Sequence, residues 1–374
     1  MIKTIAVVGC GISGAVLSAF LKKNSNINVD IYEKDLFDSK KINGIQISPN
    51  GTRILKKINF DDFNNQNLCK ISEILIRDFN SPGYLSKMSV SGYDSDYITL
   101  NRANLISFII NEFELDKQII NKEVVSIENN KLHFTEASSR EYDLIVLSDG
   151  IFSTIKANFL NRRFAYSGYN AVRGFFHLNE SNKNNVNLYM GSDYHMVFYP
   201  IDQSNNYSFT YITKSEESFL GKNYYEDKKI NFLEKNKFIV KYLPKEIFLQ
   251  KEVYMWPIYK TNNFSFGKDK VICIGDSSHG FLPTRAQGAC QAIEDSFILY
   301  NLIQNNCANS NNFFKERIQR ISKIQKKSEN SLKIFHFKNI FLRYFRNIFI
   351  KIVCKFSLFS NFFNSFIFNY KYKL

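Results

Sequence analysis

The chain has 374 residues, more than one hydrophobic core usually holds, so we expect either two interleaved domains or one large domain. With 44% hydrophobic and 22% charged residues the chain can bury a core in water, and this composition excludes a short peptide module and an integral membrane protein. The net charge is +14, but residues 315–374 carry 14 Lys or Arg and only two Glu, so the basic excess belongs to the C-terminal tail.

The apolar pattern along the chain predicts an α/β fold with a parallel sheet, into which a second, strand-rich region is inserted. In chain order, the first region is expected to contain strands over residues 2–8, 29–32, 124–127, 132–134, 144–147 and 271–274, and helices over 15–21, 103–113 and 287–303. Short alternating segments over 71–100 and 166–256, with one helix near 226–241, predict a second sheet. Residues 313–374 are expected to be helical.

Six cysteines are scattered along the chain, at positions 10, 69, 273, 290, 307 and 354. They form no Cys-x-x-Cys pair and no cluster with histidine. We therefore expect reduced thiols in a cytoplasmic protein, and no metal site.

A glycine-rich turn joins the first predicted strand to the first predicted helix. Gly9-Cys10-Gly11-Ile12-Ser13-Gly14 occupies this turn, and Glu33 ends the next strand 19 residues after Gly14. In such a motif the first glycine allows a tight turn, the second lets a pyrophosphate approach the helix N-terminus, and the third packs the helix on the strand. Glu33 would accept hydrogen bonds from a ribose. The spacing predicts a dinucleotide site, with an ordinary glycine turn as the alternative.

Two further strands end in motifs that narrow the choice of dinucleotide. The strand 144–147 leads into Ser148-Asp149-Gly150, and the strand 271–274 leads into Gly275-Asp276, followed by Pro283 and by residues 287–295. With the glycine turn, these segments resemble the single-component FAD-dependent aromatic hydroxylases, which share the p-hydroxybenzoate hydroxylase fold. The resemblance is strongest to the salicylate hydroxylase and 3-hydroxybenzoate 6-hydroxylase branch and covers roughly residues 1–340. Its other supporting segments are residues 44–50, Arg102 with Leu105, Ser153, Arg173-Gly174, His195 with Tyr199-Pro200, Trp256-Pro257, Arg317, Gln325 and Ser328.

The resemblance implies a Rossmann-like FAD-binding domain over residues 1–75, 99–165 and 266–310, interleaved with a β-sheet substrate domain over 76–98 and 166–265, and followed by a helical basic aromatic tail over 311–374. FAD would be held by Gly9, Gly11, Ser13, Gly14, Glu33, Arg102, Val125, Asp149, Asp276, Gly288 and Ala289. The alternatives are a helix N-cap for Asp276 and a surface cation for Arg102. Because the chain contains only one glycine fingerprint, NADH or NADPH is expected to act as a transient reductant without a domain of its own.

His195 and Tyr199 are the candidate catalytic pair. They lie four residues apart on a predicted strand, and this even spacing points both side chains to the same face of the sheet. A phenolic substrate reacts faster as a phenolate, so a histidine with a pKa near the working pH would serve as the base. The alternative for His195 is a core or rim histidine without a role in proton transfer. His279 is interpreted as a structural cap, and His133, His177 and His336 carry no functional prediction.

Gln46, Pro283 and Arg285 are the candidate residues of the substrate pocket. Many relatives have a hydrophobic residue at the position of Arg285, beside the flavin, so an arginine there is a departure from the family's pattern. We expect Arg285 to pair with an acidic group of the substrate by charge-assisted hydrogen bonds. An outward-facing, solvated side chain is the alternative. Asn101 and Lys156 also depart from the pattern, where many relatives have His and Arg.

The C-terminal tail combines aromatic and basic residues. From Phe335 to Leu374 there are 14 Phe or Tyr in 40 residues, and the longest uncharged run, Phe356–Tyr370, is 15 residues, shorter than the roughly 20 that span a bilayer. Such a segment fits an interfacial helix on anionic lipid. It equally fits aromatic residues that cap the substrate domain or form a homodimer face. Nucleic-acid binding has no other support in the sequence.

Together these motifs predict a monooxygenase that uses FAD, NAD(P)H and O2 to hydroxylate a small aromatic or electron-rich molecule, through a flavin hydroperoxide as the resemblance implies. An epoxidase or hydroxylase of a membrane-borne quinone or isoprenoid precursor is the alternative within the class. A flavin-dependent reductase or oxidase without oxygen insertion is the alternative outside it. The expected location is the cytoplasm, with peripheral contact at the inner face of the membrane left open.

Overall fold

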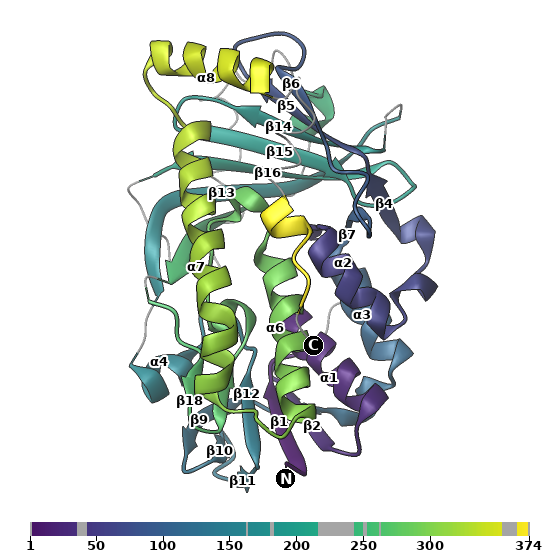
Figure 1. The fold of residues 1–374 in the computed structure, drawn as a ribbon, viewed down its shortest axis with the longest axis vertical. Helices are drawn as coiled ribbons and strands as arrows, with labels where there is room; N and C mark the ends of the chain where they lie inside the picture. Colours follow the sequence, from purple (N-terminus) through teal and green to yellow (C-terminus); the bar gives the residue numbers. More distant parts are fainter. Residues whose placement is uncertain are drawn as a thin grey trace.

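The computed structural model describes residues 2–35, 43–161, 164–179, 183–215, 243–249, 253–261, 263–353 and 365–372. The helix predicted near residues 226–241 and Cys354 lie outside these ranges. The predicted fold class is confirmed: a parallel sheet with helices is joined to a large strand-rich region and followed by C-terminal helices (Figure 1).

A six-stranded sheet, in the order β18-β19-β12-β1-β2-β8, is the centre of the first region. Its strands are β1 (Thr4–Val8), β2 (Asn28–Glu33), β8 (Ile119–Asn121), β12 (Leu144–Leu147), β18 (Gly267–Lys268) and β19 (Val271–Cys273). All neighbouring strands are parallel except the edge pair β18–β19. The apolar runs of β1 and β12 are buried along nearly their whole length, as expected for parallel strands that are covered on both faces.

The two faces of this sheet are covered by different layers. One layer consists of the helices α1 (Ile12–Asn24), α3 (Arg102–Glu112) and α6 (Gly288–Gln304). The other consists of the sheet β9 (Val124–Glu128), β10 (Lys131–Phe134) and β11 (Ser139–Glu141) with α4 (Thr154–Leu160). Ile5 and Val7 belong to the core under the helices, whereas Ala6 and Val8 belong to the core under the small sheet. The period of two along β1 therefore divides its side chains between the two cores.

The strand-rich region is a seven-stranded sheet in the order β17-β13-β16-β15-β14-β5-β6, antiparallel except for the pair β14–β5. Its strands are β5 (Glu73–Asp78), β6 (Ser86–Ser89), β13 (Phe164–His177), β14 (Asn185–Met190), β15 (Tyr194–Pro200), β16 (Asn206–Lys214) and β17 (Val253–Thr261). β5 starts three residues before the domain boundary expected at residue 76. A three-stranded sheet, β3 (Gly44–Ile47), β7 (Tyr97–Asn101) and β4 (Leu68–Ile71), and helix α2 (Pro49–Leu55) lie near the junction of the two regions (Figure 1).

Short 3-10 turns complete the described structure. They are η1 (Lys56–Ile58), η2 (Phe60–Asp62), η3 (Asn65–Asn67), η4 (Leu115–Gln118), η6 (Lys245–Leu249), η7 (Gly275–Ser277) and η8 (Pro283–Arg285).

The C-terminal segment runs from the first region to the strand-rich one. α7 (Ser310–Phe335) extends alongside α6 towards the seven-stranded sheet, and α8 (Ile340–Val353) follows at the far end of that sheet (Figure 1). Residues 365–368 form one helical turn, in which Ile367 and Phe368 are buried with Tyr97 and Tyr199. The last described residues thus pack against the sheets. Over the described ranges, none of the helices has both the length and the apolar character to cross a bilayer.

Candidate active site

The glycine turn at the end of β1 lies against the end of β12. A Cβ atom at Gly9, whose φ is 97°, would lie 2.7 Å from the Ser148 carbonyl oxygen, and one at Gly14 would lie 2.1 Å from the Gly9 carbonyl oxygen. Gly9 and Gly14 are therefore required by close packing. A Cβ at Gly11 would approach Arg102 Nη2 at 3.4 Å and meet no other atom closer than 4.0 Å. The N-terminus of α1 is thus left open on the side of Arg102, as a phosphate site requires.

Charged side chains surround the opening in front of this turn. Glu33 Oε2 accepts a hydrogen bond from the backbone N–H of Cys10 at 2.8 Å, so the Glu33 carboxylate is held beside the turn. Arg102 is exposed, yet desolvation by the surrounding protein lowers the pKa of its guanidinium, while the charges of Asp276 and Glu33 oppose this shift. Asp276 shows the same combination: its side chain is exposed, and desolvation raises the pKa of its carboxyl group. The charges of Glu33 and Asp276 both act on Arg102, so the three groups lie close together, and the region that they border is called the FAD hollow below.

This hollow fits the two parts of FAD that the sequence assigned to it. Arg102 and the open N-terminus of α1 suit a pyrophosphate, and the carboxylates of Glu33 and Asp276 suit hydroxyl groups. Asp276 lies inside η7, whose N-cap is Ile274, so Asp276 does not act as a helix N-cap. α6 begins at Gly288, and a Cβ atom at Gly288 would meet nothing within 4 Å, so this helix also starts beside open space.

The remaining predicted cofactor residues have different surroundings. Ser13 is buried, its carbonyl oxygen accepts a hydrogen bond from Ser296 Oγ at 2.8 Å, and its side chain lies close to Gly275. Ala289 is half-buried in the first turn of α6. Val125 lies on β9 with 39% of its surface exposed. The contribution of these residues to FAD binding stays a prediction.

Two buried polar atoms, Oδ1 of Asp149 and Nζ of Lys156, have no hydrogen-bond partner among the described residues. Burial raises the pKa of Asp149 to about 6, and its Oδ1 atom has no hydrogen-bond partner. The Nζ atom of Lys156 is also without a partner, although the residue is only 1% exposed, and burial lowers its pKa. Unsatisfied buried polar atoms are rare in folded proteins, so this pair is an additional sign that a polar group binds here.

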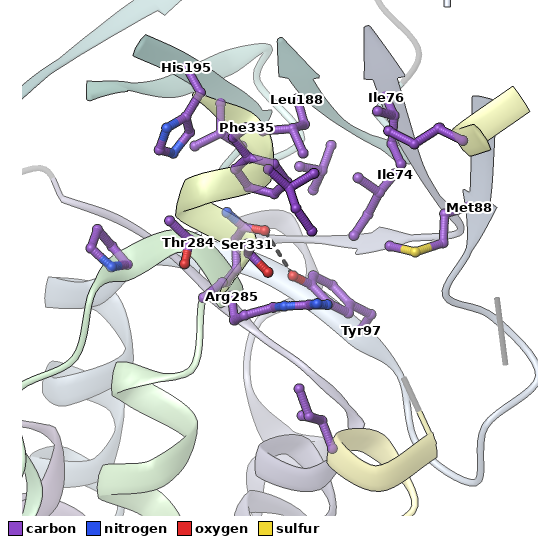
Figure 2. Close-up of a pocket in the computed structure, with 18 of the residues that line it drawn as sticks. Ile74, Ile76, Met88, Tyr97, Leu188, His195, Thr284, Arg285, Ser331 and Phe335 are labelled. Atoms are coloured by element: carbon purple, nitrogen blue, oxygen red, sulfur yellow. Dashed lines mark hydrogen bonds between the residues drawn. The ribbon is translucent and has the colours of Figure 1, made fainter. Parts of the chain in front are cut away.

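A second cavity, of about 270 Å³, lies between the seven-stranded sheet, η8 and the C-terminal helices (Figure 2). Most of its lining is apolar, and no Asp or Glu is among the described residues that line it. The lining residues are Gln46, Ile74, Ile76, Met88, Tyr97, Val186, Leu188, His195, Val197, Pro283, Thr284, Arg285, Ala286, Ser331, Ile334, Phe335, Arg346, Phe349, Ile350, Ile367 and Phe368. The structure therefore brings together His195 with the three predicted pocket residues, Gln46, Pro283 and Arg285.

Tyr199 lies behind this lining instead of in it. It is buried on the same face of β15 as Val197, as the alternation predicted, and its side chain shares a hydrogen bond with Gln46. Tyr97 also donates a hydrogen bond to Gln46 Oε1 at 2.8 Å (Figure 2). Tyr199 and Tyr97 therefore orient Gln46, the polar group that reaches the cavity.

Arg285 points into the cavity beside Tyr97 (Figure 2). Its Nε atom is buried without a hydrogen-bond partner, and it forms no ion pair among the described residues. Desolvation lowers the pKa of Arg285, and the charge of Arg285 in turn lowers the pKa of Lys327, a cation like itself. The outward-facing alternative is thus wrong: Arg285 is an uncompensated cation in an apolar cavity.

His195 is 2% exposed, and its Nδ1 atom lies 2.6 Å from Nε2 of His336. Burial lowers the pKa of His195 well below its ordinary value of 6.5, and the positive charge on His336 would add to this effect. This direction runs against the expectation of a pKa near the working pH, and the role of His195 as the base stays a prediction. His336 carried no functional prediction from the sequence, because its contact with His195 joins residues 141 positions apart.

Buried ion pairs hold α6, whose first residue, Gly288, borders the FAD hollow. Glu294 and Asp295 of α6 are fully buried against Arg317 and Arg320 of α7. Asp295 also accepts hydrogen bonds from the backbone N–H of Gly275 at 2.7 Å and bonds His279 Nε2 at 2.6 Å. The turn that carries Asp276 is thus fastened to α6.

Comparison with known proteins relates this arrangement to flavin enzymes. No family model matches the sequence. It is 23% identical to 6-hydroxynicotinate 3-monooxygenase of Bordetella bronchiseptica over 348 residues, which cover 87% of this chain and 91% of the relative. It is also 23% identical to 3-amino-4-hydroxybenzoate 2-monooxygenase of Streptomyces cremeus over 305 residues, covering 78% and 76% of the two chains.

The fold is similar to that of HpxO of Klebsiella pneumoniae, solved with FAD and uric acid, with a TM-score of 0.82, 19% identity and coverage of 98% and 97% of the two chains. It is also similar to a salicylate hydroxylase in a substrate complex, with a TM-score of 0.77, 18% identity and coverage of 99% and 96%. These likenesses agree with the resemblance found in the motifs: the chain is an FAD-dependent monooxygenase, and its fold is that of the single-component aromatic hydroxylases it is similar to.

Proposed function

We propose that this monooxygenase hydroxylates a small aromatic substrate that carries an acidic group, and that Arg285 binds this group. The proposal rests on the uncompensated Arg285 cation in the cavity. A buried cation without a partner costs free energy, which an anionic ligand would recover through charge-assisted hydrogen bonds. The names of several relatives support the same chemistry, because nicotinate, benzoate and salicylate are aromatic carboxylates.

The other side chains of the cavity have complementary roles in this proposal. The apolar wall would hold the ring and exclude water, and Gln46, oriented by Tyr97 and Tyr199, would bond a polar substituent. His195 would accept the proton of a ring hydroxyl group. FAD, held at Gly9–Gly14, Glu33, Arg102 and Asp276 and reduced by NADH or NADPH, supplies the activated oxygen when it is bound.

The test compares hydroxylated aromatic acids with the corresponding amides, on the wild-type protein and on two variants that each lose one cation. The purified protein should show a flavin spectrum, and its oxidation of NADH or NADPH should be stimulated by hydroxylated aromatic acids more than by the corresponding amides. Arg285→Met should raise the apparent KM for the acids about 10- to 100-fold and leave that for the amides nearly unchanged. Lys326→Met, which removes an exposed cation from α7, is the control. If Arg285→Met raised the apparent KM equally for acids and amides, Arg285 would not be the residue that binds the acidic group.

We also propose that α8 binds the surface of an anionic membrane. Its exposed side chains include Phe341, at 69%, and Phe345, at 65%, together with Ile340, Leu342, Tyr344, Ile348, Phe349 and Ile352. α8 contains three basic and no acidic residues. In a contact between two copies of α8, Arg343 and Lys351 would therefore find no opposite charge on the helix, whereas anionic lipid supplies it.

Sedimentation with lipid vesicles tests this membrane contact. The holoenzyme should sediment with vesicles that contain phosphatidylglycerol and should remain in solution with phosphatidylcholine alone or at high salt. A double variant, Phe341→Ser with Phe345→Ser, should lose the binding and keep its flavin. A different result would refute the membrane contact: the wild-type protein sediments with neither kind of vesicle and dimerises as its concentration rises, whereas the double variant stays monomeric. In that case α8 is an interface between two copies of the chain.

A further inference from the structure

The contact between His195 and His336 leaves one nitrogen of His195 for the cavity. The Nδ1 atom of His195 lies 2.6 Å from Nε2 of His336, and His336 is not part of the cavity lining. Of the two rings, only His195 lines the cavity, where Phe335 packs beside it with a centroid distance of 5.3 Å (Figure 2). Because Nδ1 is engaged by His336, Nε2 is the atom of His195 that can meet a substrate hydroxyl group.

Neither ring is suited to hold a positive charge. Desolvation lowers the pKa of His195 well below 6.5 and that of His336 to about 4. The charge of Arg346 on α8 lowers the pKa of His336 further, and that of Asp193 opposes this. Tyr169 of β13 contributes only a ring contact with His336. A histidine in these surroundings would be a weak base if it had to keep the proton it accepts.

A partly exposed carboxylate, that of Asp193, lies close enough to the His336 ring for its charge to act on the pKa of the ring. Its Nδ1 atom is buried without a hydrogen-bond partner in the described part of the chain. Asp193, in the turn between β14 and β15, donates its backbone N–H to the His336 carbonyl oxygen at 3.4 Å. The Asp193 carboxylate is partly exposed and pairs with Lys338 at 2.8 Å. A carboxylate in contact with solvent therefore lies next to the second ring.

We propose that His336 is a positioning residue that sets the tautomer of His195 and passes its proton on towards Asp193 and solvent. This inference rests on the proposed role of His195 as the base for a phenolic substrate. His195 carries its hydrogen on Nδ1 and donates it to His336 Nε2, which leaves a lone pair on Nε2 facing the cavity. A buried histidine pair can then remove a proton from the cavity without retaining a charge.

The transfers balance as follows. The O–H bond of the substrate breaks and its proton binds His195 Nε2, while the Nδ1 hydrogen of His195 moves to His336 Nε2. The hydrogen on His336 Nδ1 leaves to water or to the Asp193 carboxylate. The net result is one phenolate in the cavity and one proton in solvent, with both rings neutral again. The reverse transfers restore the starting tautomers when the product takes up a proton.

Nitrogen NMR of the histidine rings tests the tautomer without any substrate. The chain has five histidines, so a holoenzyme labelled with 15N-histidine gives few signals, and His195→Gln and His336→Gln assign the pair. The expected result is a neutral His195 with hydrogen on Nδ1 throughout pH 6–9. Hydrogen on Nε2 of His195 would overturn the inference, because that nitrogen could not accept a proton.

Kinetics test the transfer itself. The substrate for this test is the aromatic acid that best stimulates NAD(P)H oxidation. In His336→Gln the glutamine side chain can still accept the hydrogen bond from His195, but it cannot pass the proton on. The substitution should lower kcat at least tenfold at pH 7 with little change in KM, and the loss should shrink as pH rises and the substrate ionises in solution. Tyr169→Phe, on the other side of His336, should behave as the wild type. If His336→Gln does not fold, Asp193→Asn should produce a weaker loss with the same pH dependence.

Different results would refute the proposed function and the proton relay through His336. If no aromatic acid stimulates oxidation, the proposed function is wrong, and the NMR result still decides the tautomer. If an acid does stimulate it and the kcat of His336→Gln matches the wild type at pH 7, the base role of His195 can stand but the relay is wrong.

Discussion

The buried ion pairs between α6 and α7 allow a stability prediction to be worked out in full. Arg317 is fully buried and donates hydrogen bonds to Asp295 Oδ1 at 2.6 Å, Glu294 Oε2 at 2.9 Å and Gln291 Oε1 at 2.7 Å. Arg317→Met keeps much of the volume and removes the charge, so two buried carboxylates lose a partner. Breaking a buried pair on one side typically costs about 3–5 kcal/mol. This is a large part of the roughly 5–15 kcal/mol that stabilises a typical domain.

The pH dependence of this loss has a definite sign. Burial alone would raise the pKa of Glu294, but the charges of Arg320 and Arg317 outweigh it and lower the pKa to about 2. The pKa of Asp295 is also lowered: burial opposes the shift, and the charges of His279 and Arg317 outweigh it. Groups with a lowered pKa stabilise the fold above their unfolded pKa, near 4, and lose this contribution as pH falls. The difference between wild type and Arg317→Met should therefore be largest near pH 7, smaller at pH 4, and smaller still at lower pH.

Urea denaturation followed by circular dichroism, at pH 7 and pH 4, is the assay. Lys315→Met, an exposed site on the same helix, controls for the loss of one positive charge. The protein contains more than one sheet, so the midpoints of parallel transitions should be compared instead of a single extrapolated free energy. Equal midpoints for Arg317→Met and wild type at pH 7, or a deficit that grows at pH 4, would refute the reasoning.

Two further predictions concern the FAD hollow. Gly14→Ala should abolish flavin binding and destabilise the protein by at least about 1–3 kcal/mol, because the new Cβ atom would lie 2.1 Å from the Gly9 carbonyl oxygen. Gly288→Ala is the control: its Cβ atom would meet nothing within 4 Å, so the melting temperature of the apoprotein should not change. Asp149→Asn should stabilise the apoprotein above pH 6, by up to about 3 kcal/mol, since the raised pKa of Asp149 means that its ionisation opposes folding. This gain should vanish below pH 4, and a gain that does not depend on pH would contradict the assigned cause.

The cofactor side of the molecule was predictable because its signals are local in sequence. A strand, a glycine turn and a helix follow one another within residues 4–24, and the packing that requires Gly9 and Gly14 lies within or next to this unit. The alternation along β15 likewise placed His195 and Tyr199 on one face. Helices α3 and α6 begin within one residue of their predicted starts because their apolar stretches are long.

The substrate side was only partly predictable because its contacts join distant segments. His336 meets His195 across 141 positions, and Tyr97 reaches Gln46 across 51. The sequence offers no periodicity that links such pairs. β3 and α2, of four and seven residues, were too short for a pattern of their own. The tail was correctly predicted to be helical at α7 and α8, but its composition could not show which aromatic residues face the cavity.

The last described residues are held in place by hydrogen bonds between their backbone carbonyl oxygens and two arginine side chains. Ile367 and Phe368 line the cavity from a helical turn of only four residues, which would not be stable by itself. Arg53 donates hydrogen bonds to the carbonyl oxygens of Phe368 and Tyr370, each at 3.0 Å. Arg320 donates to that of Phe366 at 3.0 Å and also pairs with Glu294.

These arginines satisfy backbone acceptors that would otherwise be buried without partners. The same Arg320 joins the tail to α6, whose first residue, Gly288, borders the hollow assigned to FAD. One ion-pair cluster therefore fixes the cavity wall made by Ile367 and Phe368 relative to the start of α6, where Gly288 is predicted to contact FAD. In a hydroxylase the oxygen donor and the ring must meet at a set distance, and a tail fastened to the cofactor helix provides that constraint.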